Sequence, residues 1–401
     1  MANAITAMSP TYWSKRMGIK RYKGTVLRSQ ADFSEEAVLH DGRIVDRPYR
    51  ADIAVENYIK GTALTAQDLT ATSDTLTVNV IKAALLYVDD VDKIQNKYSA
   101  ANLWADEAMT RLEIALDARY LAEVYNSNNT VDAGDLGGTA GEGITVTTAN
   151  LPLVFAEINE ELDLDNVPLG ERFFNISPQF KNILWQYIQS KESALGDKTG
   201  EHGNIGTFAG LKLYLTNNSS ASARWTPANN PADADTITIE GITFTFKTTI
   251  GTTAGNILIG ANTAATIDNL VALIDAGGAS SDSGVSNVAL SAANQRTVQD
   301  WDGVDGTTYF EVRGFGENFL TVSGSDSTDV WNAAYKVQNL LAGRVGAISV
   351  VVQSEPKVEM DKTVSAGKLG LNIIPYTLAG FKTFNQGANE TVNVRIRSDA
   401  F

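Results

Sequence analysis

The sequence predicts an α+β fold with a small α+β domain inserted into it, and three stretches carry this prediction. Residues 99–127 contain neither Gly nor Pro and are rich in Ala, Leu, Glu and Arg, which indicates one long helix. Residues 148–218 alternate helical and strand-like patterns, as expected for an α/β or α+β domain. Residues 222–329 begin with a linker that contains two prolines and then show a strand hairpin, an amphipathic helix and further strands.

The long helix can begin at Ser99, whose side chain is suited to an N-cap. Its apolar residues recur every fourth position, so their line winds slowly around the helix and several neighbours must cover it. In the inserted segment, the hairpin should turn at Glu240-Gly241, with Ile242, Phe244 and Phe246 on one face. The helix should span residues 263–275.

The rest of the chain favours strands. Residues 24–82 alternate short apolar clusters with turn residues, which indicates extended strands and long loops that project from the body. The stretch "VWNAAYKVQNLLAGRVGAISVVVQ", which begins at residue 330, predicts a helix followed by a strand. The chain should finish in strands through "LGLNIIPYTLAGFKTFN" and "ETVNVRIRS".

Composition excludes several classes of protein. With 401 residues, 43% of them hydrophobic and 20% charged, the chain should fold into about two or three domains. The absence of cysteine excludes disulfides and thiolate–metal sites. No signal-peptide pattern is visible at the start, and no run approaches the roughly 20 apolar residues that span a bilayer, so no membrane partner is expected.

The charge is spread unevenly along the chain, whose net charge is −15. The first 30 residues hold six basic residues and no acid: Lys15, Arg16, Lys20, Arg21, Lys23 and Arg28. Residues 219–330 hold 13 acidic residues and four basic ones. A basic terminal arm favours contact with a neighbouring subunit or with nucleic acid, although a solvated tail is an equal alternative.

No motif points to catalysis or to a cofactor. His202 stands beside Gly203 and His40 two residues before Gly42, and both are interpreted as turn residues. The Gly-rich stretch 128–143 lacks the Gly-Lys-Ser/Thr ending of a phosphate loop, and "GDKTG" at 196–200 is interpreted as a mobile loop. The acidic groups at 89–92 and 163–165 are interpreted as helix starts and solvated faces.

One weak metal candidate remains in "DWDGVDGTTYFE". Asp300, Asp302 and Glu311 occupy positions 1, 3 and 12 of a calcium-binding loop. Val304 fails position 5, however, and Asp305 replaces the glycine of position 6. We therefore favour an acidic turn between strands, with a calcium site as the alternative.

The order of the elements carries a family resemblance. The "VDDVDKIQNKY" link, the long helix, "RFFNISPQFKNILW" and "GNIGTFAGLKLYLTNN" follow one another, and "AISVVVQSEPKVEM" and "IPYTLAGFKTFN" close the chain. This order resembles the major capsid protein of tailed bacteriophages, the Hong Kong ninety-seven-type coat fold. Ser177-Pro178 after a strand and Gly206–Gly210 before one are also family-like when taken together.

The resemblance implies a division of the chain into six parts. These are an N-terminal arm at 1–23, an extended loop at 24–80, a peripheral domain at 81–147 with a spine helix at 99–127, the first part of the axial domain at 148–221, the inserted α+β domain at 222–329, and the axial-domain return with the final peripheral strands at 330–401. The acidic inserted domain should fold alone and face outward, because its charge would repel packaged DNA.

By the same likeness, the chain should be a structural protein rather than an enzyme. It should assemble with itself into hexamers and pentamers, which form an icosahedral shell around a viral double-stranded DNA genome. Its other partners would be the packaged DNA, by non-specific contact, and scaffold, portal and decoration proteins. It would be assembled in the host cytoplasm and reside in the virion. Alternatives are an encapsulin-like cellular shell, a glycan-binding adhesin that uses the acidic loop around Trp301, and, least favoured, a hydrolase.

Overall fold

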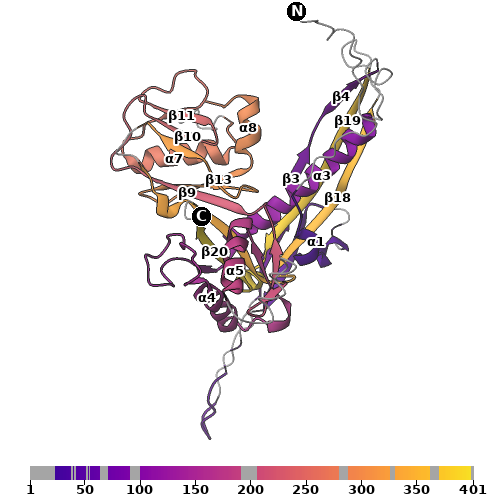
Figure 1. The fold of residues 1–401 in the computed structure, drawn as a ribbon, viewed down its shortest axis with the longest axis vertical. Coiled ribbons are helices and arrows are strands. Elements are labelled where there is room, and N and C mark those ends of the chain that lie inside the picture. Colours follow the sequence, from indigo (N-terminus) through magenta and orange to yellow (C-terminus); the bar gives the residue numbers. More distant parts are fainter. Residues whose placement is uncertain are drawn as a thin grey trace, which may run out of the picture.

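The structure is a computed structural model that describes residues 23–37, 39, 42–50, 53, 55–63, 71–90, 100–190, 206–279, 288–325, 330–361 and 370–398. Figure 1 shows a long arm built from α3, β18 and β19, a compact body with α4 and α5, and a third unit beside the arm that holds α7 and β10–β13. The described part confirms an α+β architecture.

The long arm is a helix packed along a twisted sheet. Helix α3, Ala100–Ala122, runs beside strands β18, Ile348–Asp361, and β19, Gly370–Thr383 (Figure 1). A short 3-10 helix, η3, Glu123–Asn126, continues α3, so the helix predicted over 99–127 is confirmed, although Ser99 lies outside the described residues. Strand β19 pairs with β18 on one side and, on the other, with β3, Val80–Ala83, and β4, Leu86–Asp89.

The body is built on a ten-stranded sheet with the order β13-β14-β9-β17-β6-β8-β7, to which β16, β20 and β5 are attached. Its strands are β5 Asn129–Val131, β6 Arg172–Ile176, β7 Thr207–Phe208, β8 Leu211–Leu215, β9 Ser220–Thr226, β13 Trp301–Asp305, β14 Phe310–Gly314, β16 Val330–Trp331, β17 Val337–Arg344 and β20 Thr391–Arg397. A short helix, α9, Asn385–Asn389, precedes β20.

Two helices cover the body sheet and bury its apolar residues. They are α4, Leu151–Leu164, and α5, Pro178–Gln189. Helix α5 begins where expected, because the Ser177 hydroxyl accepts a hydrogen bond from the backbone N–H of Phe180 and Pro178 occupies the first turn. Phe155, Phe174 and Phe180 pack edge to face or tilted in the resulting core.

The sequence prediction was wrong between residues 330 and 344. In place of a helix, the structure has one 3-10 turn, η5, Ala333–Tyr335, and then strand β17. Seven of the eight residues of β17 are buried, because β17 lies inside the sheet between β9, β6 and β20. A strand covered on both faces lacks the apolar–polar alternation that distinguishes strands from helices in a sequence.

The inserted unit has a core of its own, and its predicted hairpin is confirmed. Strands β10, Thr236–Ile239, and β11, Ile242–Lys247, pair around Glu240-Gly241, where both residues have positive φ angles of 47° and 76°. Strands β12, Asn256–Leu258, and β15, Val322–Gly324, complete this sheet. Helix α7, Thr263–Asp275, has the predicted bounds, and α8, Ala292–Val298, follows it.

The inserted unit is nevertheless continuous with the body. Its strands β13 and β14 pair with each other, β14 pairs with β9, and β9 pairs with β17 of the body sheet. Strand β9 crosses the predicted boundary at residue 222. The core of the unit also takes in Trp225, which stacks on Phe246, and Trp331, which lies beyond the predicted end. The segment that keeps this core intact therefore spans residues 220–331.

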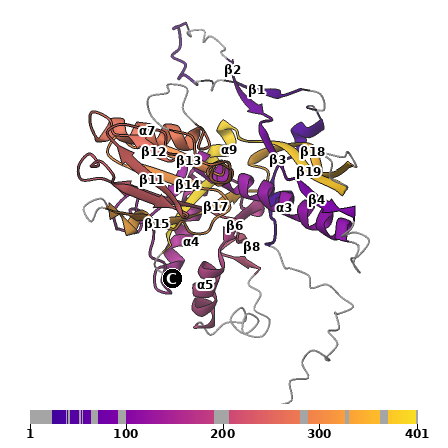
Figure 2. The same ribbon diagram turned by 90° about the horizontal axis from the view of Figure 1, so that it is seen from above.

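The N-terminal part of the predicted extended loop lies against the long arm. Val26 and Leu27, at the short helix α1, Leu27–Gln30, are buried against α3. A 3-10 turn, η2, Ser34–Ala37, follows, and only then does the chain extend into β1, Ile44–Arg50, which pairs with β2, Ala71–Thr77. This β1–β2 hairpin reaches outward (Figure 2). The projecting segment is thus shorter than predicted, because the apolar residues at 26–27 find a buried site on the chain's own helix.

Candidate assembly surfaces

A buried carboxylate fixes the N-terminal segment to the long helix. Asp117 of α3 is fully buried, and one of its oxygens accepts hydrogen bonds from the backbone N–H groups of Val26 at 2.7 Å and Leu27 at 2.9 Å. Its other oxygen accepts from the side-chain amide of Asn218 at 2.9 Å. Burial raises the pKa of Asp117, and these hydrogen bonds oppose the increase. One side chain therefore joins α3, the start of α1 and the loop that enters β9.

The structure describes two of the six basic residues predicted to form an assembly arm. The Lys23 ammonium donates to the backbone oxygen of Gly316 at 2.9 Å, and the Arg28 guanidinium forms an exposed ion pair with Glu355 at 2.6 Å. The hydrogen bond and the charge of Glu355 raise the pKa of Arg28. Both residues thus contact their own chain. The other four, Lys15, Arg16, Lys20 and Arg21, lie outside the described residues.

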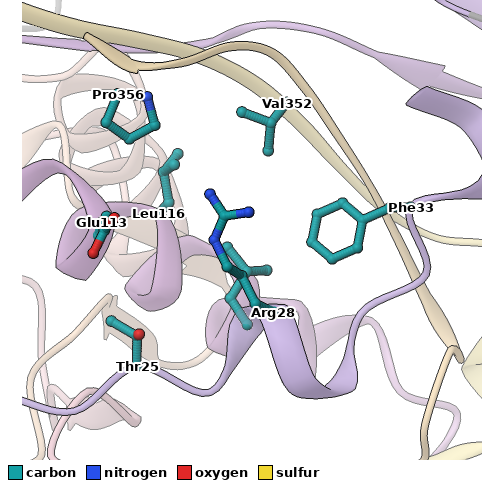
Figure 3. Close-up of a pocket in the computed structure, with 8 residues that line it drawn as sticks. Thr25, Arg28, Phe33, Glu113, Leu116, Val352 and Pro356 are labelled. Atoms are coloured by element: carbon teal, nitrogen blue, oxygen red, sulfur yellow. The ribbon is translucent and has the colours of Figure 1, made fainter. Parts of the chain in front are cut away.

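A pocket of about 130 Å³ opens beside Arg28 (Figure 3). Leu27, Phe33, Leu116, Val352 and Pro356 give it an apolar lining, and Thr25, Arg28 and Glu113 complete it. In Figure 3 the Arg28 side chain extends between Leu116 and Phe33. Its volume is close to that of an engineered cavity of about 150 Å³ that holds a benzene ring.

The outer part of the β1–β2 hairpin exposes large apolar side chains. Within the described residues between the two strands, four such side chains are exposed: Ile53 at 70%, Val55 at 96%, Tyr58 at 66% and Ile59 at 68%. Single exposed apolar residues are ordinary on protein surfaces, but a concentration of them on a projecting segment marks an interaction surface. We call residues 53–59 the hairpin tip.

The structure does not gather the calcium candidates into a ligand set. Asp302 and Glu311 lie on the paired strands β13 and β14, where Asp302 faces Arg313 across the ladder and Glu311 faces Val304. Asp300 forms an ion pair with Lys82, and Asp302 forms one with Arg313 at 3.5 Å. Among the described residues, no three His, Cys, Asp or Glu side chains are grouped as metal ligands would be. Asp302 and Glu311 thus lie on the two strands of the β13–β14 hairpin, each opposite a residue that is not acidic.

Glu311 instead forms the centre of a buried ionic cluster. Its side chain is 7% exposed and lies 3.0 Å from Arg224, 3.7 Å from Arg313 and 3.9 Å from Arg395. The Arg224 guanidinium also stacks between the rings of Tyr309 and Tyr335. Sequence reasoning missed this cluster, because its arginines come from β9, β14 and β20. The only local signal was a Glu and an Arg two residues apart on one strand.

The remaining candidates are one core residue and several residues that lie outside the described part of the chain. Trp301, the residue that suggested a glycan-binding loop, is 6% exposed and belongs to the core of the inserted unit. His40, His202 and residues 196–200 lie outside the described residues. No described helix is long and apolar enough to span a bilayer.

The chain has the fold of phage capsid proteins. No protein-family model matches the sequence, and no curated protein matches it. Among solved structures, one described as "Mycobacterium phage Che8" aligns over 97% of this chain and 98% of its own, with a TM-score of 0.56 and 14% identity. The capsid structure of the cyanophage P-SCSP1u aligns over 99% and 95%, with a TM-score of 0.53 and 11% identity. A structure described as "Mycobacterium phage Ogopogo" aligns over 99% of both chains, with a TM-score of 0.51 and 11% identity.

Proposed function

We propose that this chain is the major capsid protein of a tailed bacteriophage. In this role it assembles with itself into hexamers and pentamers, which tile an icosahedral shell around a double-stranded DNA genome. The observation that carries the proposal is the agreement of fold over nearly the whole of this chain and nearly the whole of the phage chains. A likeness that extends from end to end concerns the whole subunit rather than one shared module.

The surfaces of the protomer support self-assembly. The hairpin tip carries four exposed apolar side chains at the end of the projecting β1–β2 hairpin, and a pocket close in volume to one aromatic ring lies beside α1. Heterologous contacts of this kind, in which one surface of a subunit fits a different surface of the next, generate rings when the rotation closes. We assign the pocket to Tyr58 of a neighbouring copy, whose ring matches the volume available.

The proposal extends to the partners of the shell and to its location. Packaged DNA would contact the shell through non-specific phosphate contacts, for which Lys15, Arg16, Lys20 and Arg21 of the basic arm are the proposed source. Scaffold, portal and decoration proteins would bind during or after assembly in the host cytoplasm. The acidic inserted unit would face outward, where its negative charge adds solubility and does not repel the packaged DNA. The burial of Trp301 leaves the adhesin alternative without the residue that suggested it.

Electron microscopy of the purified full-length chain tests this function. We expect closed shells, or rings of five and six subunits, and nuclease-protected DNA in particles recovered from phage-infected cells. A double change at the hairpin tip, Val55→Asp with Ile59→Asp, should abolish assembly while the chain stays folded. The matched control is Phe319→Asp, an exposed apolar residue of the inserted unit, 38% exposed, which should leave assembly intact. A chain that remains monomeric at all concentrations and salt conditions would refute the proposal.

A further inference from the structure

A second pocket, of about 160 Å³, lies where strand β3, helix α3 and the inserted unit meet. Asn79, Val80, Ile81 and Lys82 line it from the start of β3, Arg119 from α3, and Gln299 from the residue after α8. Among the described residues that line it, two are cations and two are amides, and none is a carboxylate. This composition differs from that of the apolar pocket beside Arg28.

Arg119 is held in place but has no anionic partner within the described part of the chain. Its guanidinium carbon lies 4.4 Å from the centre of the Phe315 ring, which fixes the guanidinium plane. None of the ion pairs found among the described residues includes Arg119. Stacking occupies the face of a guanidinium and leaves its five in-plane N–H donors available.

Lys82 adds a second ammonium to the same lining. It forms an ion pair with Asp300, and its side chain is only 25% exposed, so the amine is held near the surface of the pocket. Asp300 offsets the charge of Lys82 but not that of Arg119. The pocket therefore keeps an excess of one positive charge, together with amide N–H groups from Asn79 and Gln299.

We propose that this pocket binds a tetrahedral oxyanion of the phosphate type, with Arg119 as its principal ligand. A guanidinium fork pairs with two oxygens of such an anion at once, and an ammonium and amide donors satisfy the others. The anion is either free phosphate or the phosphodiester of a nucleic acid, since both present the same oxygens. This inference does not depend on the proposed capsid function.

Binding here would join three units that already touch at this point. Gly316, next to Phe315, approaches α3 so closely that a Cβ atom there would lie 2.7 Å from the Cβ of Ala118. The Lys23 ammonium donates a hydrogen bond to the backbone oxygen of Gly316, and Lys82 forms an ion pair with Asp300. An anion between Arg119, Lys82 and Gln299 would add a further bridge between α3, β3 and the inserted unit.

The test uses the full-length chain and inorganic phosphate. Phosphate is titrated against chloride at constant ionic strength, while thermal unfolding and the phosphorus-31 linewidth of the ligand are recorded. We expect saturable binding with a rise in Tm, because a ligand that binds only the folded state stabilises it. Arg119→Gln should weaken phosphate binding by about tenfold or more, since charge-assisted bidentate hydrogen bonds are the strong ones.

Two further variants keep the test decisive. Arg111→Gln, two turns earlier on the same helix, removes the same charge outside the pocket and should bind phosphate as the parent does. If Arg119→Gln fails to fold, Gln299→Ala replaces it, because Gln299 is exposed and its loss leaves the Phe315 contact intact. No saturable binding by the parent, or equal binding by parent and pocket variants, would overturn the site.

A competition experiment identifies the source of the anion. A short duplex oligonucleotide is added to the phosphate-loaded chain. If it displaces phosphate from the parent, and Arg119→Gln binds it more weakly than Arg111→Gln does, the natural ligand is a nucleic-acid phosphodiester. If phosphate stays bound and neither variant changes the binding of DNA, the ligand is free phosphate.

Discussion

Gln30 and Asn175 exchange two side-chain hydrogen bonds, one in each direction, at 2.7 and 2.9 Å. Both side chains are fully buried. The pair joins the end of α1 to β6, and so holds the N-terminal segment to the body sheet as Asp117 holds it to α3. A reciprocal amide pair satisfies one donor and one acceptor on each side chain, which makes the burial of two polar groups tolerable.

Replacement of one partner should therefore be costly. Gln30→Leu leaves the Asn175 amide buried without a partner, and we expect a loss of about 1–3 kcal/mol in the free energy of unfolding, measured by urea denaturation. Gln353→Leu is the matched control, because its amide donates to Gly42 from an exposed site and its loss should cost little. Equal effects of the two substitutions would show that the buried pair is not a stabilising contact.

The pH dependence of stability should report on Asp117. Because burial raises its pKa in the folded chain, the folded state holds the proton more tightly than the unfolded state does. The stabilisation linked to this group is complete below the unfolded pKa of about 3.9 and is lost as the pH rises through the folded pKa. The Tm of the parent relative to that of Asp117→Asn should therefore fall as the pH increases from 4 to 7. Asp106→Asn, on the exposed side of the same helix, controls for general charge effects, and a relative Tm that rises with pH would contradict this assignment.

The ionic cluster gives the largest expected loss of stability. Glu311→Gln removes the acid on which Arg224, Arg313 and Arg395 converge, leaving guanidinium groups close together with less compensation. Breaking a buried ion pair in this way costs about 3–5 kcal/mol. Glu355→Gln removes only an exposed pair with Arg28, a change worth about 0–1 kcal/mol. The Tm of Glu311→Gln should lie well below that of Glu355→Gln. Similar Tm values would contradict this prediction.

The assignment of Tyr58 to the neighbour's pocket can be tested by crosslinking, because the chain has no cysteine of its own. A variant with Tyr58→Cys and Glu113→Cys should form disulfides between chains when assembled material is oxidised, and none when dilute monomer is. Disulfide formation requires the two Cα atoms to approach within about 4.4–6.8 Å. Tyr58→Cys with Thr243→Cys, on the inserted unit, is the control pair. Shells that assemble but give no crosslink would leave the capsid proposal intact and exclude this contact.

The inserted unit should fold on its own only when its true limits are respected. A fragment of residues 219–332 keeps β9, Trp225 and Trp331, and should show a cooperative thermal transition. A fragment of 227–329 loses both tryptophans and the strand on which β14 is paired, and should remain largely unfolded. Circular dichroism of the two fragments decides the matter, and a cooperative transition in the shorter one would contradict it.

Local patterns in the sequence were enough to predict the elements that local chemistry determines. The helix at 263–275, the Glu240-Gly241 hairpin and the long helix all depend on propensities and turn residues within a few positions. The contacts that organise the candidate surfaces could not be predicted in this way. Asp117 lies 91 residues from Val26, Gln30 lies 145 from Asn175, and Glu311 lies 87 from Arg224. Such pairs become visible only when the topology brings them together.

The pairing of β14 with β9, and of β9 with β17, has a mechanical consequence. Domains joined by a flexible linker swivel about it, whereas units that share a sheet transmit force through its ladder of backbone hydrogen bonds. A pull or push on the inserted unit would be carried as shear across β9 into the middle of the body sheet. In a shell of the proposed kind, a load on the wall would therefore act on the body sheet and the inserted unit together.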